Sequence, residues 1–175
     1  MSLNEKLLFL KNFLRNPLRN ASIIPSSRHA AQAVITDLDW TKINVIDELA
    51  PGNGTFTKEI LLKCNPDAFL ILIELEDSYI ELLQKKFGER IHVVHDSAHH
   101  LHVILENFGF HKTDLIVSSL PFLPNPIRDQ VNNAILSETR SGAAFRFFTY
   151  MPPIMKKFYK GMPLRKIKFV LNNIP

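Results

Sequence analysis

The residues most suited to chemistry lie in a turn that follows an early apolar run. The segment VIDELAPGNGTFTKEIL, residues 45–61, passes from apolar residues through Glu48 and two closely spaced glycines into a helical pattern. Glycines between a strand and a helix let the backbone approach a ligand closely, because they carry no Cβ. A dinucleotide-binding turn needs a third glycine where Thr57 stands, and no G-x-x-x-x-G-K-[ST] sequence is present. Dinucleotides and nucleoside triphosphates are therefore disfavoured.

Two further acidic residues follow the next two apolar runs. Glu74 follows FLILI, and Asp96 follows HVVH. A carboxylate in such a place can accept two hydrogen bonds at once, because it has two oxygen atoms. Taken singly, each acid also fits a helix cap or a surface charge, and the glycine turn also fits a tight connection. Their order on successive runs favours one shared binding site.

The hydrophobic pattern predicts the scaffold that positions these residues. Apolar runs alternate with helical patterns, and runs such as FLILI and LIV are apolar throughout, as in parallel strands covered on both faces. Repeated strand–helix units define a doubly wound α/β domain, which binds ligands at the carboxyl ends of its strands. The expected strands are 44–48, 69–74, 92–95, 115–118, 144–150 and 166–171, with a short basic segment at 154–160. The expected helices are 3–15, one begun by Ser26 or Ser27, 57–63, 77–88, 101–108 and 128–136.

The segment ELAPGNG, residues 48–54, resembles motif I of the class I S-adenosylmethionine-dependent methyltransferases, usually E/D-x-G-x-G-x-G. Glu74, Asp96 and the segment DLIVSSLPF match the later motifs of that class, at the ends of the second, third and fourth strands. The resemblance implies a Rossmann-like fold with S-adenosylmethionine as cofactor. It implies that Glu74 holds both ribose hydroxyls and that Asp96 receives the adenine amino group, with Leu75 and Ser97 against the adenine. Ala50 departs from the motif, because it replaces the first glycine and is strained if its φ is positive.

Longer segments are similar to the bacterial phospholipid N-methyltransferases, which are relatives of the ribosomal RNA adenine dimethylases. These segments are FLKNFLRNPLRNASIIPSSRHAA, ELAPGNGTFT, SSLPFLPNP and FRFFTYMPP. The resemblance implies methylation of the amino group of phosphatidylethanolamine, in up to three steps, towards phosphatidylcholine. It also implies that the turn at 25–27 covers the cofactor. The residues expected to bind the cofactor are Ser26, Ser27, Glu48, Ala50, Gly52, Asn53, Gly54, Glu74, Leu75, Asp96, Ser97 and Ser118.

The fourth motif distinguishes a lipid amine from an adenine. Adenine N6 methyltransferases carry an asparagine or aspartate that accepts from the base amine, and an aromatic ring that stacks on the flipped base. Here the motif is Ser119-Leu120-Pro121-Phe122, without the amide, which disfavours a nucleic acid and leaves an RNA adenine N6-methyltransferase as the alternative. The expected catalytic residues are Ser119 and Leu120, whose carbonyls would orient the amine, and Pro121, which turns the chain. Tyr150 is expected to face a methylated ammonium, or else caps the sheet edge.

The N-terminal residues form a basic amphipathic pattern. Residues 1–30 carry a net charge of +4 and residues 140–175 of +8, against −8 for residues 31–139. Basic ends suit an anionic partner, and aromatic residues among cations suit binding in the plane of an anionic membrane. The aromatic residues are Phe9 and Phe13, the cations Lys6, Lys11 and Arg15, and a separate leucine stripe suits packing on the domain.

We therefore divide the chain into an N-terminal amphipathic helix and linker, residues 1–24, and a methyltransferase domain, residues 25–175. The expected location is cytoplasmic, attached peripherally to the inner face of the membrane where the phospholipid substrate lies. A helix packed wholly on the domain is the simpler alternative for the N-terminus. A membrane-associated protein that binds S-adenosylmethionine without catalysis is a further alternative, and Ala50 is its only support.

Two features are expected to be absent. Five histidines between residues 92 and 102 could suggest a metal, but a strand followed by a helix directs their rings to different faces, and we expect no metal. The class usually has a seventh strand beside the fifth. The strand pattern here stops after 166–171, so either the seventh strand is missing or the sixth pairs differently, and the sequence leaves both open.

Overall fold

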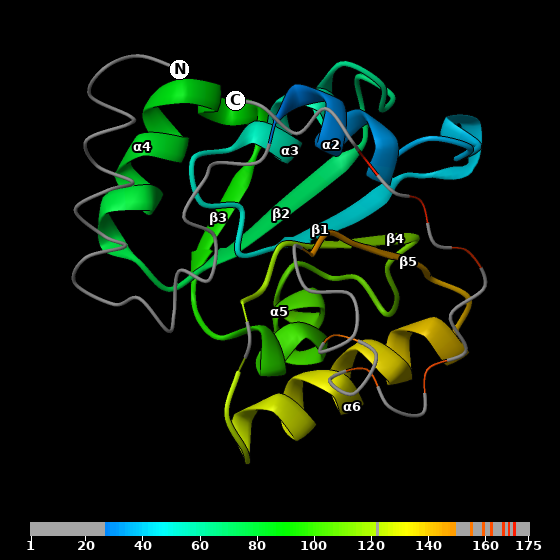
Figure 1. Ribbon diagram of the computed structural model, residues 1–175. Coiled ribbons are helices and arrows are strands. Elements are labelled where there is room, and N and C mark those ends of the chain that lie inside the picture. The colour runs from blue at the N-terminus through cyan, green and yellow to red at the C-terminus, as the bar shows by residue number, and fades with distance from the viewer. Residues whose placement is uncertain are drawn as a thin grey trace.

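The computed structural model describes residues 27–121 and 123–149, together with Met155, Tyr159, Met162, Lys166, Lys168 and Val170. Within these residues, five strands form one parallel sheet in the order β3-β2-β1-β4-β5 (Figure 1). The chain fills one half of the sheet from β1 outward and then returns to the other side of β1, so the order reverses between β1 and β4. Ligands of doubly wound folds bind outside the carboxyl ends at such a reversal. The strands are β1 (Val45–Leu49), β2 (Phe69–Glu74), β3 (His92–His95), β4 (Leu115–Ser118) and β5 (Ala144–Phe147).

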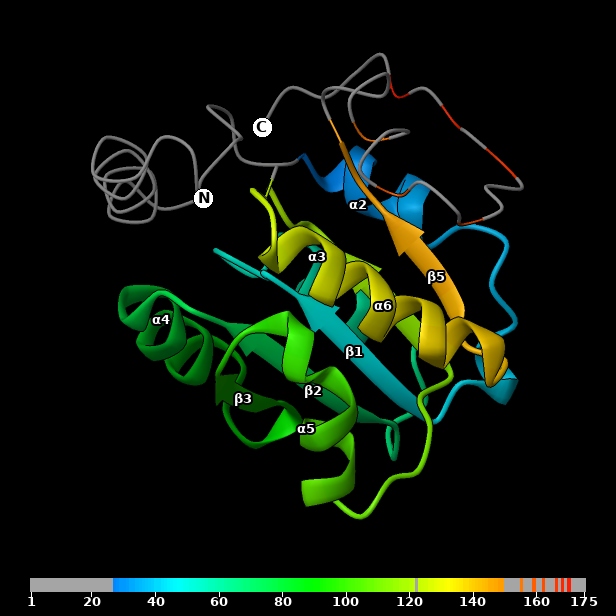
Figure 2. The ribbon, with the colours of Figure 1, turned by 90° about the horizontal axis from the view of Figure 1, so that it is seen from below.

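Helices cover both faces of the sheet, which is why its strands are apolar almost throughout. One face carries α2 (Arg28–Val34), α3 (Thr55–Leu61) and α4 (Asp77–Phe87). The other carries α5 (Leu101–Asn107) and α6 (Ile127–Arg140), which lie in front of the sheet when it is seen from below (Figure 2). Three short 3-10 helices complete the elements: η1 (Trp40–Lys42), η2 (Gly88–Arg90) and η3 (Ala98–His100).

The core divides into two layers because successive strand residues point to opposite faces. In β1, Val45 and Leu49 pack with the layer of α5 and α6, whereas Ile46 packs with α2, α3 and α4. The same alternation places Asp47 and Glu48 on opposite faces, and both are fully buried. The centre of the sheet therefore holds one carboxyl group in each layer.

The predicted doubly wound parallel fold is confirmed, and β2, β3 and β4 have the predicted bounds. Ser27 caps α2 as predicted, because its hydroxyl accepts from the backbone N–H of Ala30 at 3.1 Å. The strand predicted to run from 144 to 150 is shorter. It ends at Phe147, and the Phe148 N–H donates to the carbonyl of Ser118, the last residue of β4, at 3.1 Å. Helix α6 is longer than predicted and ends at Arg140.

The strand predicted at 166–171 is not seen at its described residues, Lys166, Lys168 and Val170, which have no regular secondary structure. Both lysine side chains instead donate to Asp37, at 2.8 and 2.9 Å. These hydrogen bonds lower the pKa of Asp37 to about 2. Both lysines therefore contact one exposed carboxylate, on a residue between α2 and η1.

Three predictions concern residues outside the described ones: the N-terminal helix at 3–15, Ser26 and Tyr150. Among the residues that are described, no helix has the length and apolarity needed to cross a membrane.

Candidate active site

The turn after β1 combines left-handed backbone with open space. Ala50, Gly52 and Gly54 have φ values of +56°, +56° and +76°. This region favours glycine, so Ala50 holds the strained conformation that the missing motif glycine would adopt freely. A Cβ added at Gly52 would meet no atom within 4 Å, whereas one added at Gly54 would lie 2.5 Å from the ring of Phe87. Gly54 therefore lets α4 pack closely, and Gly52 faces open space.

Polar contacts hold this turn in place. The side-chain oxygen of Asn53 accepts from the N–H and the hydroxyl of Thr55, at 3.2 and 2.7 Å. Lys86 of α4 donates to the Asn53 carbonyl at 2.9 Å. On the inner side, the hydroxyl of Thr57 donates to Glu48 at 2.7 Å. Because Glu48 is fully buried, it anchors the turn from inside, and its contact with a cofactor stays a prediction.

Glu74 ties the turn to the end of β2. One of its oxygens accepts the N–H of Gly52 at 3.0 Å, and the other accepts those of Leu75 and Glu76 at 2.8 and 3.1 Å. Burial raises the pKa of Glu74, and the three backbone donors oppose that shift. Each carboxylate oxygen can accept more than one donor. A ligand beside the open side of Gly52 would thus meet an acceptor for its hydroxyl groups.

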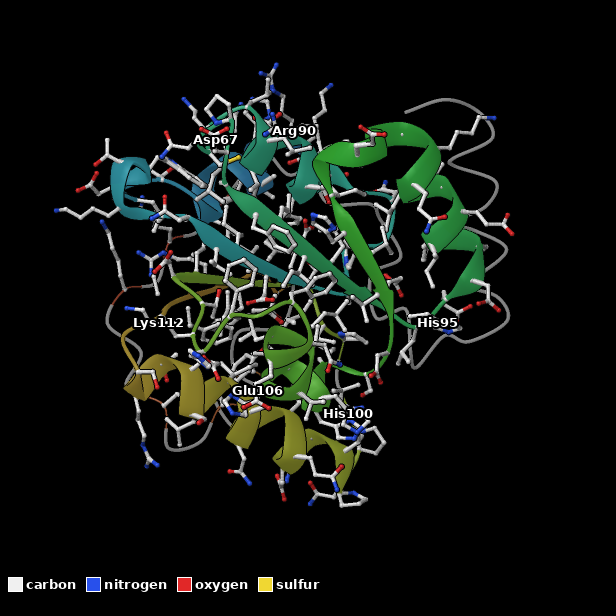
Figure 3. All side chains as sticks on the ribbon, turned by 180° about the vertical axis from the view of Figure 1, so that it is seen from behind. Asp67, Arg90, His95, His100, Glu106 and Lys112 are labelled. Carbon is white, nitrogen blue, oxygen red and sulfur yellow. The ribbon has the colours of Figure 1, made fainter. Side chains whose placement is uncertain are left out.

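The ends of β2 and β3 supply an apolar side chain and a second carboxylate. Leu75 is 46% exposed, which offers an apolar surface next to Glu74. Asp96 Oδ1 accepts from the Ser97 N–H at 2.6 Å and lies 2.8 Å from His100 Nδ1. The hydrogen bond from His100 is the main cause that lowers the pKa of Asp96. Figure 3 shows His95 at the end of β3 away from Arg90, and His100 on the turn that follows.

The loop after β4 lies beside the turn after β1. The Ser119 N–H donates to the Leu49 carbonyl at 3.0 Å, and the Leu120 N–H donates to the Ser118 hydroxyl at 3.3 Å. The Ser119 hydroxyl oxygen is buried and has no hydrogen-bond partner among the described residues. Pro121 is partly buried at the end of this described stretch. The backbone of Ser119 and Leu120 is thus fixed next to the glycine turn.

Tyr159 is a residue beside the loop after β4 that the sequence did not reveal. It is buried, its hydroxyl lies 3.4 Å from that of Ser118, and its ring packs on Phe145 and Phe147 at centroid distances of 5.2 and 4.6 Å. Burial raises the pKa of Tyr159 to about 12, so the hydroxyl stays neutral. In the sequence, the lysines around Tyr159 indicated only a basic segment, and the adjacent residues match no motif.

The structure brings the described site residues to one edge of the sheet. They follow β1, β2, β3 and β4, and the carboxyl ends of parallel strands meet at the same edge. The one exception is Ser27, which caps α2. No group of histidine, cysteine or acidic side chains in the described part of the chain could hold a metal ion.

Solved methyltransferases share this fold. The TrmN structure from Thermus thermophilus matches 79% of the chain with a TM-score of 0.53 and 16% identity. A 1,6-didemethyltoxoflavin-N1-methyltransferase from Burkholderia thailandensis, solved with S-adenosylhomocysteine, matches 84% with a TM-score of 0.53 and 15% identity. The chain spans 42% and 64% of these two structures. The strand order and these likenesses show that the chain has the Rossmann-like fold of the class I S-adenosylmethionine-dependent methyltransferases.

The chain is also similar in sequence to two named methyltransferases. The chain is 27% identical over 162 residues to an ornithine lipid N-methyltransferase from Singulisphaera acidiphila, which covers 90% of this chain and 84% of the relative. It is 34% identical over 62 residues to a ribosomal RNA small subunit methyltransferase A from a Sulfurihydrogenibium species. This second match covers 35% of this chain and 23% of the relative. No protein-family profile matches the chain.

The residues present fit the cofactor of this class. Gly52 faces open space, and its N–H donates to one oxygen of Glu74, so an acceptor for hydroxyl groups lies next to the turn. The exposed Leu75 and the carboxylate of Asp96 stand at the adjoining strand ends. S-adenosylmethionine is the methyl donor of the class, and its activated methyl group leaves the protein mainly a task of alignment.

Proposed function

We propose that the chain transfers a methyl group to the amino group of a membrane phospholipid, phosphatidylethanolamine and its methylated forms, towards phosphatidylcholine. The observation that carries this proposal is the similarity to a lipid N-methyltransferase over 90% of the chain and 84% of that relative. The motif Ser119-Leu120-Pro121 supports it, since no amide is present to bind an adenine.

In the proposed reaction the lipid nitrogen attacks the methyl carbon of S-adenosylmethionine. A C–N bond forms, the C–S bond breaks with its electron pair going to sulfur, and S-adenosylhomocysteine leaves. The amine must lose a proton to water before it attacks, because only the neutral form has a free lone pair. Desolvation beside a cationic sulfonium lowers the pKa of the amine and favours that neutral form.

The loop after β4 would orient the amine. The carbonyls of Ser119 and Leu120 accept N–H donors, and Ser118 fixes the Leu120 backbone. The buried Ser119 hydroxyl, which has no hydrogen-bond partner in the described part, is a further acceptor. Glu74 would accept the ribose hydroxyls and Asp96 the adenine amino group. No side chain is required as a general base, because the reaction depends on position more than on proton transfer.

A methyl-transfer assay tests this proposal. Four substrates are offered separately with labelled S-adenosylmethionine. Three are lipids in vesicles, namely phosphatidylethanolamine, its monomethyl form and an ornithine lipid, and the fourth is an RNA. We expect label in both phosphatidylethanolamine arms and none in the RNA. The variant Glu74→Ala, which lacks the proposed ribose acceptor, is assayed for comparison. Label in the ornithine lipid alone would retain a lipid amine as the substrate class and overturn the headgroup. Label in none of the lipids would overturn the proposal.

An RNA adenine is the second candidate. The 34% identity to a ribosomal RNA methyltransferase over 62 residues favours it. The match covers 35% of the chain, and Ser119 stands where an amide would receive the base. Label in the RNA arm alone would establish this candidate in place of the first.

A further inference from the structure

The strongest unexplained contacts of the site join Asp96 and Ser97 to two histidines. His100 Nδ1 lies 2.8 Å from Asp96 Oδ1, and His99 Nδ1 lies 2.8 Å from Ser97 Oγ. The two rings also contact each other, with centroids 3.7 Å apart. No metal explains these histidines, since no group in the described residues could hold one. Their partners are the two residues expected at the adenine.

We propose that His100 is a positioning residue that orients Asp96 for the adenine amino group, an inference that depends on the proposed role of Asp96. Both partners of Asp96, the Ser97 N–H and the His100 ring, bond the same oxygen, Oδ1. In the described part of the chain, Oδ2 has no such partner. The carboxylate is therefore held with one oxygen occupied and the other available to a ligand, and its side chain is 37% exposed.

The fold holds His100 firmly enough to do this. His100 ends η3, and its neighbours Ala98 and Leu101 are buried in the core against the layer of α5 and α6. The terminal torsion of an aspartate is broad, so an unrestrained carboxylate would turn freely. With Nδ1 as the donor, the imidazole removes that freedom.

This arrangement gives selectivity for an amino group. An adenine amino group donates to Oδ2, whereas a hypoxanthine presents a carbonyl oxygen that the carboxylate repels. A site built to bond a donor rejects an analogue that lacks it, because its own polar group is then left without a partner. Loss of the oriented carboxylate should therefore reduce selectivity between the two bases.

Calorimetry with S-adenosylhomocysteine and S-inosylhomocysteine tests the proposal. In His100→Ala we expect the affinity for S-adenosylhomocysteine to fall about threefold to tenfold, as for the loss of one ordinary hydrogen bond, with little change for the inosine analogue. His100→Asn should restore selectivity, because its amide nitrogen occupies nearly the place of Nδ1. His111→Ala, an exposed histidine away from the site, is the matched control.

Each outcome decides the matter. Reduced selectivity in His100→Ala, with recovery in His100→Asn, supports the proposal, and melting temperatures show whether the variants fold. Unchanged selectivity in His100→Ala overturns it, as does an equal loss for both ligands, which indicates a merely structural role. Asp96→Ala tests the proposed adenine contact of Asp96 separately from the role of His100. If this variant keeps wild-type selectivity, the adenine role of Asp96 is wrong as well. The methyl-transfer assay is independent of all these results.

Discussion

At the scale of residues, the turn after β1 contains one strained residue and one closely packed glycine. Ala50 holds φ at +56°, and Gly54 leaves no space for a side chain against α4. Left-handed backbone costs a residue with a Cβ roughly 1–2 kcal/mol. The class motif has a glycine at the position of Ala50, so the departure acts on the backbone and not on a reacting group.

We expect Ala50→Gly to raise the free energy of unfolding by no more than about 1 kcal/mol, since the flexibility of glycine in the unfolded chain offsets the relieved strain. Gly54→Ala should lower it by about 1–3 kcal/mol, because the added methyl would lie 2.5 Å from Phe87. Gly52→Ala is the control, with the same positive φ and open space. Urea denaturation measures all three. Equal stability of the Gly54 and Gly52 variants would contradict the packing role of Gly54.

Glu74 is expected to dominate cofactor affinity. Glu74→Gln keeps the shape but replaces an acceptor oxygen with a donor, and should weaken binding of S-adenosylhomocysteine by about 1.5–3 kcal/mol. Asp96→Ala should have a smaller effect, because Asp96 serves one amino group. Calorimetry measures both, with the exposed Glu89→Gln as control. Wild-type affinity in Glu74→Gln would remove the ribose assignment.

The two buried carboxyls of β1 should make stability depend on pH. Burial raises the pKa of Asp47 to about 7, with the charge of Glu138 adding to the shift, and raises that of Glu48 to about 8. Both groups keep their protons in the folded state at pH values where the unfolded chain has lost them. Stability is therefore fully present below about pH 4 and is lost as the pH rises towards 7 and 8.

Removing one carboxyl tests this dependence. With pKa shifts of about three units in each group, at about 1.4 kcal/mol per unit, wild type should lose up to about 8 kcal/mol between pH 4 and 8 through these groups. In Glu48→Gln the decline should be smaller, because the amide does not titrate. Melting temperatures recorded across this range for both proteins provide the measurement. Parallel curves would show that Glu48 does not titrate there.

At the scale of elements, the buried aromatic residue Tyr159 joins the sheet to the chain beyond it. Tyr159 packs on Phe145 and Phe147 of β5 and reaches Ser118 of β4. Ser118 in turn accepts the Leu120 N–H. The position of the loop expected to orient the amine thus depends on a residue 39 positions further along the chain.

Tyr159→Phe isolates the hydroxyl, because the ring packing is kept. We expect kcat of methyl transfer to fall about threefold to tenfold, in line with the loss of one hydrogen bond, while the affinity for S-adenosylhomocysteine stays at the wild-type value. Tyr79→Phe, a change of the same kind at a buried residue of α4, is the control. A fall in cofactor affinity with unchanged kcat would place Tyr159 outside the loop that aligns the substrate.

At the scale of the whole molecule, charge is distributed unevenly, with basic ends and an acidic middle. The proposed membrane partner depends on this asymmetry and on Phe9 and Phe13 among the N-terminal cations. Each basic residue near an anionic bilayer contributes about 1 kcal/mol, and salt screens that attraction within a Debye length.

Removal of residues 1–16 should abolish binding to anionic vesicles and lipid methylation, while the affinity for S-adenosylhomocysteine changes little. Replacing Phe9 and Phe13 with serine should have the same effects as this deletion. Replacing Asn4 and Asn12 with serine is the matched control. Co-sedimentation with vesicles at low and high salt measures the binding. An intact protein that stays in the supernatant at low salt would contradict the membrane proposal.

The sequence by itself determined the fold and the edge of the sheet at which the candidate site residues lie. Apolar runs such as FLILI and the turn ELAPGNG are patterns of residues that are neighbours along the chain. The strands, the parallel sheet and the edge that carries Glu74 and Asp96 could therefore be predicted from local pattern. The sequence also indicated that Ala50 would be strained if its φ were positive, and the structure gives it a φ of +56°.

Tertiary structure alone decided which side chains meet across the fold. Nothing in the local pattern shows that Tyr159 reaches Ser118, that Lys166 and Lys168 pair with Asp37, or that Glu48 is buried beneath its own turn. Even the bond from His100 to Asp96, four residues apart, requires the turn to be folded against α5 and α6. Such contacts depend on distances in space, and these are fixed only when the layers of the sheet have packed.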